Sequence, residues 1–125
     1  MSSGLINTFY SVNNLISTEN SIKADIHFNA GHDVFKGHFP QMPVVPGVCQ
    51  VQIIKDLLEE ITGNETMMVS GDNIKFTGMI LPDKHPNVNL EINFTKTEGG
   101  LTADAKLFFE EITFTKHKGK YKILN

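Results

Sequence analysis

The chain has 125 residues, of which 40% are hydrophobic and 20% are charged, and its formal net charge is -3. This length predicts a single domain covering residues 1–125 and excludes a separate cofactor-binding domain. All eleven basic residues are lysines, so the chain has no guanidinium for bidentate binding of phosphate. The acidic balance argues against a nucleic-acid-binding protein.

Cysteine usage and the first residues bear on the cellular compartment. Cys49 is the only cysteine, so no internal disulfide can form and a reducing compartment is expected. Residues 1–10 lack a basic segment followed by a long apolar stretch. No apolar run approaches the roughly 20 residues that cross a bilayer. We therefore expect a cytoplasmic protein without a membrane span.

The first half of the chain predicts one strand and one helix clearly. Ser21–Phe28 alternates apolar and polar residues, as a half-buried strand does. A strand or a short helix around residues 5–15 precedes it. From Gly47 to about Thr62, apolar residues recur at spacings of three and four before Gly63-Asn64. This pattern predicts a helix with a wide apolar face.

The second half predicts antiparallel strands. Residues 88–95 and 103–109 alternate on either side of Gly99-Gly100, which indicates a hairpin. The alternation changes phase at Glu110-Glu111, where the pattern fits a bulge or a turn. One long helix among antiparallel strands is typical of an α+β fold.

Two further breaks are predicted from turn-forming residues. Residues 67–81 read as another strand region, interrupted at Ser70-Gly71-Asp72 and ended by Pro82-Asp83. Lys118-Gly119 predicts a last tight turn close to the end of the chain.

The segment 35–48 joins a strand to the predicted helix and contains three prolines, two glycines and His38. Prolines restrict their own backbone and that of the preceding residue, so His38 is expected to have a fixed geometry. Gly47 and Val48 offer N–H groups at the start of the helix, where negative charge on a carbonyl oxygen is stabilised. The alternative is a simple connection in which His38 bonds a backbone carbonyl.

These residues resemble a known family. Gly-His-Phe-Pro at 37–40, Pro-Val-x-Pro-Gly-Val at 43–48, Lys75-Phe76 and Pro82-Asp83 are similar to the signature of beta-hydroxyacyl-acyl-carrier-protein dehydratases. The resemblance implies the hot-dog fold, an antiparallel sheet wrapped around one long central helix. It also implies a homodimer or higher homo-oligomer with sites at the interface, and a substrate carried by acyl carrier protein.

The resemblance also implies roles for individual residues. In such enzymes the loop histidine removes a proton from C2 of a 3-hydroxyacyl thioester, and this role falls on His38. A neutral imidazole suits that transfer near pH 7. The backbone donor of the family maps to Gly47, and Phe39, Pro46 and Val48 are expected to contact substrate. The reaction requires no cofactor and no metal.

The sequence departs from the family at the partner carboxylate, because the position fourteen residues after His38 is Gln52. An amide cannot protonate a leaving hydroxyl group, although the amide can orient that hydroxyl by hydrogen bonding. Asp56 lies one helical turn further on and can supply a carboxylate on the same face. The alternative is that Gln52, Asp56 and Glu59 form the solvated face of the helix.

Two other helix residues are less easily interpreted. Gln50 falls near the apolar face, where an unpaired amide is costly, so it is expected to bond across a dimer or to face an acyl tunnel. We favour the bond across the dimer. Cys49 lies near the helix N-terminus, but no cysteine-dependent motif surrounds it, so a packed, inert thiol is expected.

The remaining polar residues suggest no metal site. The sequence contains no H-E-x-x-H motif and no Cys/His cluster. Lys116, Lys118, Lys120 and Lys122, with His117, form a basic segment near the C-terminus. It reads either as a solvated sheet edge that prevents aggregation or as a docking patch for an acidic carrier protein.

Three functions are compatible with the sequence. The leading hypothesis is a 3-hydroxyacyl thioester dehydratase, with His38 as base and Asp56 or Gln52 assisting. The second is a catalytically weak hot-dog subunit that binds acyl chains or acyl carrier protein and partners an active homologue. The third is thioester hydrolysis, in which Asp56 or Glu59 directs a water molecule.

Overall fold

The computed structural model describes residues 9–32 and 44–124, with residues 71 and 72 described by their backbone alone. It contains one helix and six strands within these ranges. The elements are β1 (Tyr10–Ser17), β2 (Ser21–Phe28), α1 (Gly47–Thr62), β3 (Thr66–Phe76), β4 (Asn87–Thr97), β5 (Gly100–Phe109) and β6 (Ile112–Ile123).

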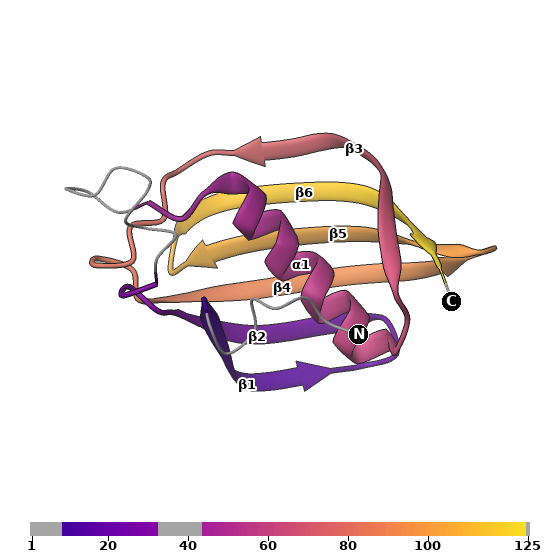
Figure 1. Cartoon of the computed structure of the whole chain (residues 1–125), viewed down its shortest axis with the longest axis horizontal. Coiled ribbons are helices and arrows are strands. Elements are labelled where there is room, and N and C mark those ends of the chain that lie inside the picture. Colours follow the sequence, from indigo (N-terminus) through magenta and orange to yellow (C-terminus); the bar gives the residue numbers. More distant parts are fainter. Residues whose placement is uncertain (1–8, 33–43, 125) are drawn as a thin grey trace.

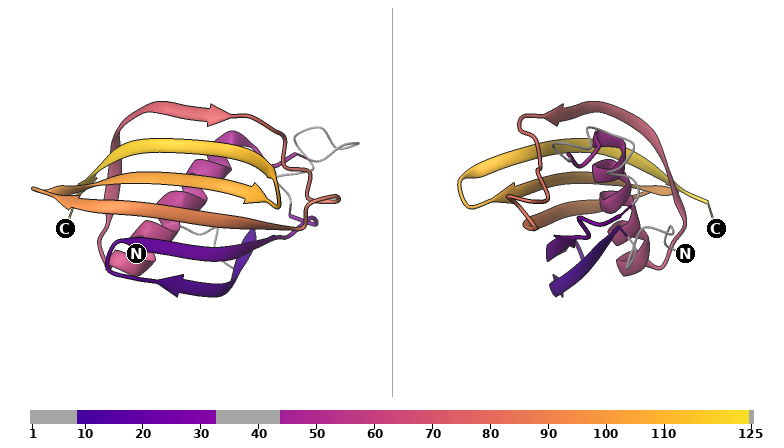
Figure 2. Two further views of the ribbon diagram at one scale, coloured as in Figure 1. Left: turned by 180° about the vertical axis from the view of Figure 1, so that it is seen from behind. Right: turned by 60° about the vertical axis from the view of Figure 1, so that its left-hand side comes forward.

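The six strands form one sheet in the order β1-β2-β4-β5-β6-β3, and each neighbouring pair is antiparallel. The sheet curves, and α1 crosses its concave face diagonally (Figures 1 and 2). The α+β arrangement of one long helix wrapped by an antiparallel sheet is therefore confirmed. The edges of the sheet are β1 and β3.

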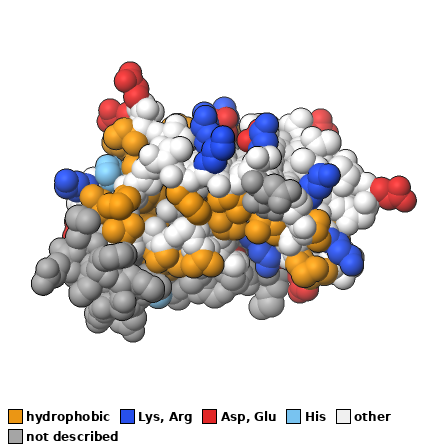
Figure 3. All heavy atoms as spheres, turned by 90° about the horizontal axis from the view of Figure 1, so that it is seen from above, with side chains coloured by type: hydrophobic (Ala, Val, Ile, Leu, Met, Phe, Trp, Pro, Cys, Tyr) orange, Lys and Arg blue, Asp and Glu red, His pale blue; other side chains and the backbone are white. Residues whose placement is uncertain are grey.

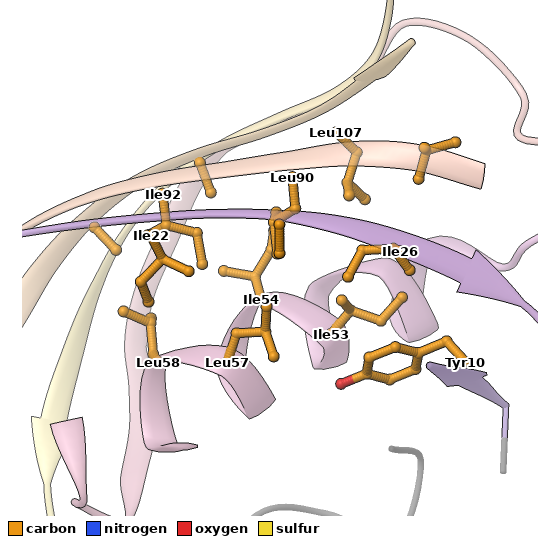
Figure 4. Close-up of a cluster of buried hydrophobic side chains, with 14 of the residues drawn as sticks. Tyr10, Ile22, Ile26, Ile53, Ile54, Leu57, Leu58, Leu90, Ile92 and Leu107 are labelled. Atoms are coloured by element: carbon orange, nitrogen blue, oxygen red, sulfur yellow. The ribbon is translucent and has the colours of Figure 1, made fainter. Parts of the chain in front are cut away.

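The core lies between the helix and the concave face of the sheet. Alternate residues of β2, β4 and β5 point toward the helix, and its wide apolar face meets them (Figure 4). The labelled side chains include Ile22, Ile26, Leu90, Ile92 and Leu107 from the sheet and Ile53, Ile54, Leu57 and Leu58 from α1. Burying each such side chain stabilises the fold by about 1.5–3 kcal/mol.

The helix begins and ends where the sequence predicts. Pro46 is its N-cap in an extended conformation, and Gly63 adopts a left-handed conformation with φ of 73°. The N–H of Gly63 donates to the carbonyl of Glu59 at 2.9 Å, which is a common way to end a helix. The described residues form no helix that is both long and apolar enough to span a membrane.

Most strand predictions are confirmed. Ser21–Phe28 is β2, and the hairpin around Gly99 is β4 and β5. The region around 5–15 is a strand from Tyr10 onward, and its first residues lie outside the described ranges. At Glu110-Glu111 both alternatives occur, because Glu110 turns with φ of 52° and the register between β5 and β6 shifts at Phe108.

The predicted extent of the strand at 67–81 is too long. β3 ends at Phe76, and the carbonyl of Ile80 instead accepts the N–H of Val45, just before the helix. The interruption at residues 70–72 is a register irregularity against β6 rather than a break in the strand.

The predicted tight turn at Lys118-Gly119 is wrong, because β6 runs without interruption to Ile123. Gly119 pairs with Ala103 of β5 inside the sheet. A Cβ atom on Gly119 would lie 2.6 Å from the His117 imidazole and 3.0 Å from the carbonyl of Ser70. Glycine is therefore required by close packing and not by a turn.

Candidate active site

The start of α1 presents free backbone donors in a fixed position. The Pro46 carbonyl accepts the N–H groups of Cys49 and Gln50 at 3.0 and 3.1 Å. Helix geometry gives the N–H groups of Gly47 and Val48 no intrahelical acceptor. Val45 donates to the Ile80 carbonyl at 2.9 Å, which anchors the preceding residue. The positive end of the helix dipole is thus held in place.

Close packing explains why residue 47 is glycine. A Cβ atom there would lie 2.7 Å from Cζ of Phe76, so only glycine lets the β3 aromatic ring approach the helix this closely. Phe76, Val48 and Met79 are themselves largely exposed. Figure 3, which views the molecule from the β3 side, shows hydrophobic side chains along this edge. Further exposed apolar residues of β3 are Met67 and Val69.

Asp56 is completely buried and bonds to two side chains. Its Oδ2 accepts the hydroxyl of Tyr10 at 2.9 Å, and its Oδ1 accepts Nε2 of Gln52 at 2.8 Å. Burial, reinforced by the Asp56 carboxylate, raises the pKa of Tyr10 above its ordinary value. The phenol therefore stays protonated and acts as a donor.

Glu59 is also buried, and it accepts hydrogen bonds from Thr66 at the start of β3. Its Oε2 accepts the backbone N–H of Thr66 at 2.6 Å and the Thr66 hydroxyl at 3.3 Å, and Lys55 lies 3.5 Å away. Glu59 therefore ties the helix to the start of β3. The alternative that Gln52, Asp56 and Glu59 form a solvated face is wrong, because the two carboxylates are buried and Gln52 is half-buried.

Gln50 bonds within the chain, so the favoured bond across a dimer is wrong. Its Nε2 donates to the Val45 carbonyl at 3.1 Å, and its Oε1 accepts the hydroxyl of Thr115. The amide thereby links the segment before α1 to β6. Cys49 is half-buried, and burial raises the pKa of its thiol, which fits a packed thiol rather than a nucleophile.

The structure brings several predicted site residues together. Pro46, Gly47 and Val48 form the start of α1, and Gln52 and Asp56 follow on the same helix face as Val48 at spacings of four. His38 and Phe39 lie outside the described residues. Tyr10 was missed by sequence reasoning, since a tyrosine in an uncertain first strand gives no signal of a partner 46 positions away.

His117 does not belong to the basic segment of β6. It is fully buried, and its Nε2 lies 2.8 Å from the hydroxyl of Tyr121, whereas the alternating lysines are exposed on the opposite face. Burial lowers the pKa of His117. The interpretation of this segment as a sheet edge is also wrong, because β6 lies between β5 and β3.

The described residues contain no group of three or more histidine, cysteine, aspartate or glutamate side chains that could hold a metal ion. Among the described residues, the polar groups at and near the helix start are the backbone N–H groups, the Gln52 amide and the buried Asp56 carboxylate.

The chain is similar to several known proteins. Residues 14–110 match the family described as ApeI-like, ApeI dehydratase. The 3-hydroxyacyl-[acyl-carrier-protein] dehydratase FabZ of Bacillus subtilis (strain 168) is 30% identical over 98 residues, covering 68% of this chain and 70% of that protein. FabZ of Bacillus velezensis is 33% identical over 78 residues, and the match spans 56% of this chain and about half of that relative, 53%.

A solved structure shows the same fold. The dehydratase heterocomplex ApeI:P from Xenorhabdus doucetiae contains a chain that superposes with a TM-score of 0.73 at 21% sequence identity. The superposition covers 90% of this chain and 97% of that chain. The hot-dog fold expected from the sequence is thus confirmed.

Proposed function

Because this chain belongs to the ApeI-like dehydratase family, we propose that it removes water from a 3-hydroxyacyl thioester carried by acyl carrier protein. The product is a trans-2-enoyl thioester. The observation that carries the proposal is the start of α1 at Gly47. Two backbone N–H groups there have no acceptor within the helix, and Gln52 and Asp56 follow on the same helix. The reaction changes no oxidation state overall and needs no cofactor.

In the proposed reaction His38 is the base. It takes a proton from C2, and the N–H of Gly47 stabilises the enolate-like oxygen of the thioester at the positive end of the helix. The C3–O bond then breaks as the C2–C3 double bond forms. The leaving hydroxyl takes the proton back from the imidazolium and departs as water, so one residue serves as base and then as acid.

Gln52 and Asp56 shape this mechanism. An amide has no acidic proton to give, so Gln52 orients the hydroxyl group and does not protonate it. Asp56 is fully buried and bonded to Tyr10 and Gln52. Its position supports a role behind Gln52 rather than as the acid itself.

A second hot-dog chain is proposed to associate along β3. This strand is an edge of the sheet, and its apolar side chains Met67, Val69 and Phe76 are exposed to water, which is unfavourable. A homodimer formed there would cover the apolar edge next to Gly47. Analytical ultracentrifugation of the full chain and of a Val69→Lys variant tests this, since the variant is expected to dissociate.

Acyl carrier protein is proposed to approach the outer face of β3, β5 and β6. Six of the eleven lysines lie on these strands, at 75, 106, 116, 118, 120 and 122. Lys75, Lys116 and Lys106 occupy one row across the three strands. The same strands contain two acidic residues, Asp72 and Asp104, and the Asp104 carboxylate lies 3.9 Å from Lys118. A positively charged surface mainly increases the rate at which an acidic partner associates with it.

The substitution Lys116→Glu/Lys120→Glu tests this surface. It is expected to raise KM for acyl carrier protein substrates about tenfold at low salt. The KM for a short pantetheine thioester, which lacks the carrier, should stay unchanged. Equal effects on both substrates would contradict a carrier-docking role.

A second candidate function rests on Gln52. The amide at the position of the family carboxylate, together with the burial of Asp56, also fits a subunit of low activity that supports an active homologous partner. This candidate predicts bound acyl carrier protein without turnover. Hydrolysis by Glu59 is disfavoured, because its carboxylate is bonded to Thr66.

The deciding experiment measures enoyl formation and hydration by the purified chain. Short and long 3-hydroxyacyl and trans-2-enoyl carrier-protein substrates are compared, with His38→Ala as control. Turnover that falls at least a hundredfold in His38→Ala supports the dehydratase. Binding without turnover supports the partner subunit, and neither binding nor turnover would refute both.

A further inference from the structure

The orientation of the Gln52 amide is fixed by the chemistry of its neighbour. A carboxylate can only accept hydrogen bonds, so the side of Gln52 that meets Oδ1 of Asp56 at 2.8 Å must be its nitrogen. The reversed amide would place two oxygen acceptors against each other inside the protein, which is costly. The carboxamide oxygen of Gln52 therefore points away from Asp56.

Tyr10 holds Asp56 in turn. Its hydroxyl donates to Oδ2 at 2.9 Å, and the residue is only 1% exposed, with its ring packed against α1 (Figure 4). Asp56 thus receives one donor from β1 and one from its own helix. Each carboxylate oxygen of Asp56 therefore accepts a hydrogen bond from a neighbouring side chain.

The fixed amide lies toward the reactive end of the helix. Val48, Gln52 and Asp56 share one helix face. Exposure falls along this face: Val48 is 78% exposed, Gln52 is half-buried and Asp56 is completely buried. Gln52 is therefore the polar group of this cluster that a ligand at the helix start can reach.

We propose that Tyr10 and Asp56 are positioning residues that hold Gln52 with its carboxamide oxygen toward the ligand, where it accepts a hydrogen bond from the 3-hydroxyl group. This inference rests on the proposed function. It predicts that the site distinguishes 3-hydroxyacyl chains from acyl chains that lack the hydroxyl. A chain without the hydroxyl leaves the amide oxygen without a donor.

The test measures binding in the full chain carrying His38→Ala, so that the substrate is not consumed. Calorimetry compares 3-hydroxyhexanoyl-pantetheine with hexanoyl-pantetheine, and the ten-carbon pair is measured in the same way. The parent is expected to prefer the hydroxylated ligand about tenfold, which corresponds to about 1.4 kcal/mol. Asp56→Leu should reduce the preference to below about threefold, and Tyr10→Phe should reduce it less.

A matched control separates positioning from stability. Tyr121→Phe removes another buried phenol hydroxyl, one that faces His117 and not Asp56. It should lower stability and leave the preference unchanged. Tyr10→Phe/Asp56→Leu removes donor and acceptor together, so it keeps the test available if Asp56→Leu alone folds poorly.

A second measurement needs no ligand. In nitrogen-15 spectra, the side-chain NH2 signals of Gln52, assigned with Gln52→Leu, should exchange slowly with water. They should exchange at least tenfold faster in Asp56→Leu and be unaffected in Tyr121→Phe.

Each outcome decides between the claims. An unchanged preference in Asp56→Leu and in the double variant overturns the inference, as does a parent with no preference. In either case His38-dependent turnover would leave the proposed function standing. If the parent binds neither ligand and the wild-type chain has no turnover, the proposed function fails and the inference falls with it.

Discussion

Two buried polar clusters, each built around a tyrosine, lie in different parts of the protein. Tyr10 donates to Asp56, which is joined to the half-buried Gln52 on the helix. Tyr121 contacts His117 four residues away on the same strand, with its ring at a right angle to the imidazole. The first cluster contains a carboxylate and reaches a partly exposed residue, whereas the second is neutral and enclosed.

The difference shows that burial alone does not identify a functional group. Burial raises the pKa of Tyr121 to about 12 and raises that of Tyr10 as well, so both phenols stay protonated near neutral pH. What separates the clusters is their connection to an accessible side chain. Gln52 provides that connection at the helix, whereas the His117 ring is packed closely against Gly119 within the sheet.

The largest expected effect comes from adding a carboxyl group to the first cluster. Gln52→Glu places it within hydrogen-bond distance of Asp56, and two carboxylates this close share one proton. The added group therefore holds a proton at neutral pH and can give it to the leaving hydroxyl. We expect kcat for dehydration to rise about a hundredfold and to fall again as pH increases.

The pH profile of kcat checks this prediction, with Gln52→Glu/Asp56→Gln as control. The control keeps a carboxyl group at 52 without the neighbouring carboxylate, so its activity should begin to fall at a lower pH. Identical profiles for the two variants would argue against a shared proton.

Adding a side chain at Gly119 should disrupt the second cluster. Gly119→Ala places a methyl group within 2.6 Å of the His117 ring, and we expect the free energy of unfolding to fall by about 2 kcal/mol. Gly31→Ala, where the nearest atom is 3.5 Å away, should change it by less than about 0.5 kcal/mol. Urea titration followed by circular dichroism measures both. Similar losses in the two variants would show that packing at Gly119 is not special.

Acid should destabilise the second cluster through His117. Burial lowers its pKa in the folded state, and its ordinary value is about 6.5. Below pH 6.5 the unfolded chain therefore binds a proton that the folded chain does not. This residue lowers stability progressively as pH falls through that range, by at most about 1.4 kcal/mol per pH unit, until the folded pKa is reached.

Comparison with His117→Gln isolates this contribution. The difference in unfolding free energy between wild type and variant, measured by urea titration from pH 8 to pH 5, should shrink as pH falls. A constant difference over this range would show that His117 does not titrate on unfolding.

The smallest effect is expected at Glu59, a buried carboxylate outside both clusters. Glu59→Gln keeps an oxygen that accepts the N–H of Thr66, so the cost should be about 1 kcal/mol in unfolding free energy. The kcat per folded molecule should stay unchanged, because Glu59 bonds the start of β3. A large loss of kcat without a loss of stability would assign Glu59 to the site.

Periodicity and turn residues were sufficient to predict α1, β2 and the β4–β5 hairpin. Apolar spacing of three and four marks a helix, and strict alternation marks a strand, whatever the rest of the fold does. Gly119 was wrongly predicted to form a turn. Glycine occurs in turns because its backbone is flexible, but it also occurs in strands where a neighbour leaves no room for a side chain. The close contacts with His117 and Ser70 distinguish the two cases.

For the candidate site, sequence patterns placed Pro46 and Gly47 at the helix start, and Gln52 and Asp56 on one helix face. They did not show that Asp56 is buried, because a helical wheel gives directions around the helix and not what covers them. Tyr10, on a strand far away in sequence, meets the buried carboxylate and donates a hydrogen bond to it. The favoured bond of Gln50 across a dimer failed for the same reason, since Thr115 and Val45 meet the amide within the chain.

The sequence by itself determined the fold class, the helix limits and the family resemblance, because these depend on local periodicity and on short motifs. The tertiary structure alone decided which polar residues are buried, which partners they bond and which way the Gln52 amide faces. Those properties depend on contacts between residues distant in the chain, such as Tyr10 and Asp56. Because a carboxylate accepts hydrogen bonds, its contact with Gln52 orients the amide nitrogen toward Asp56.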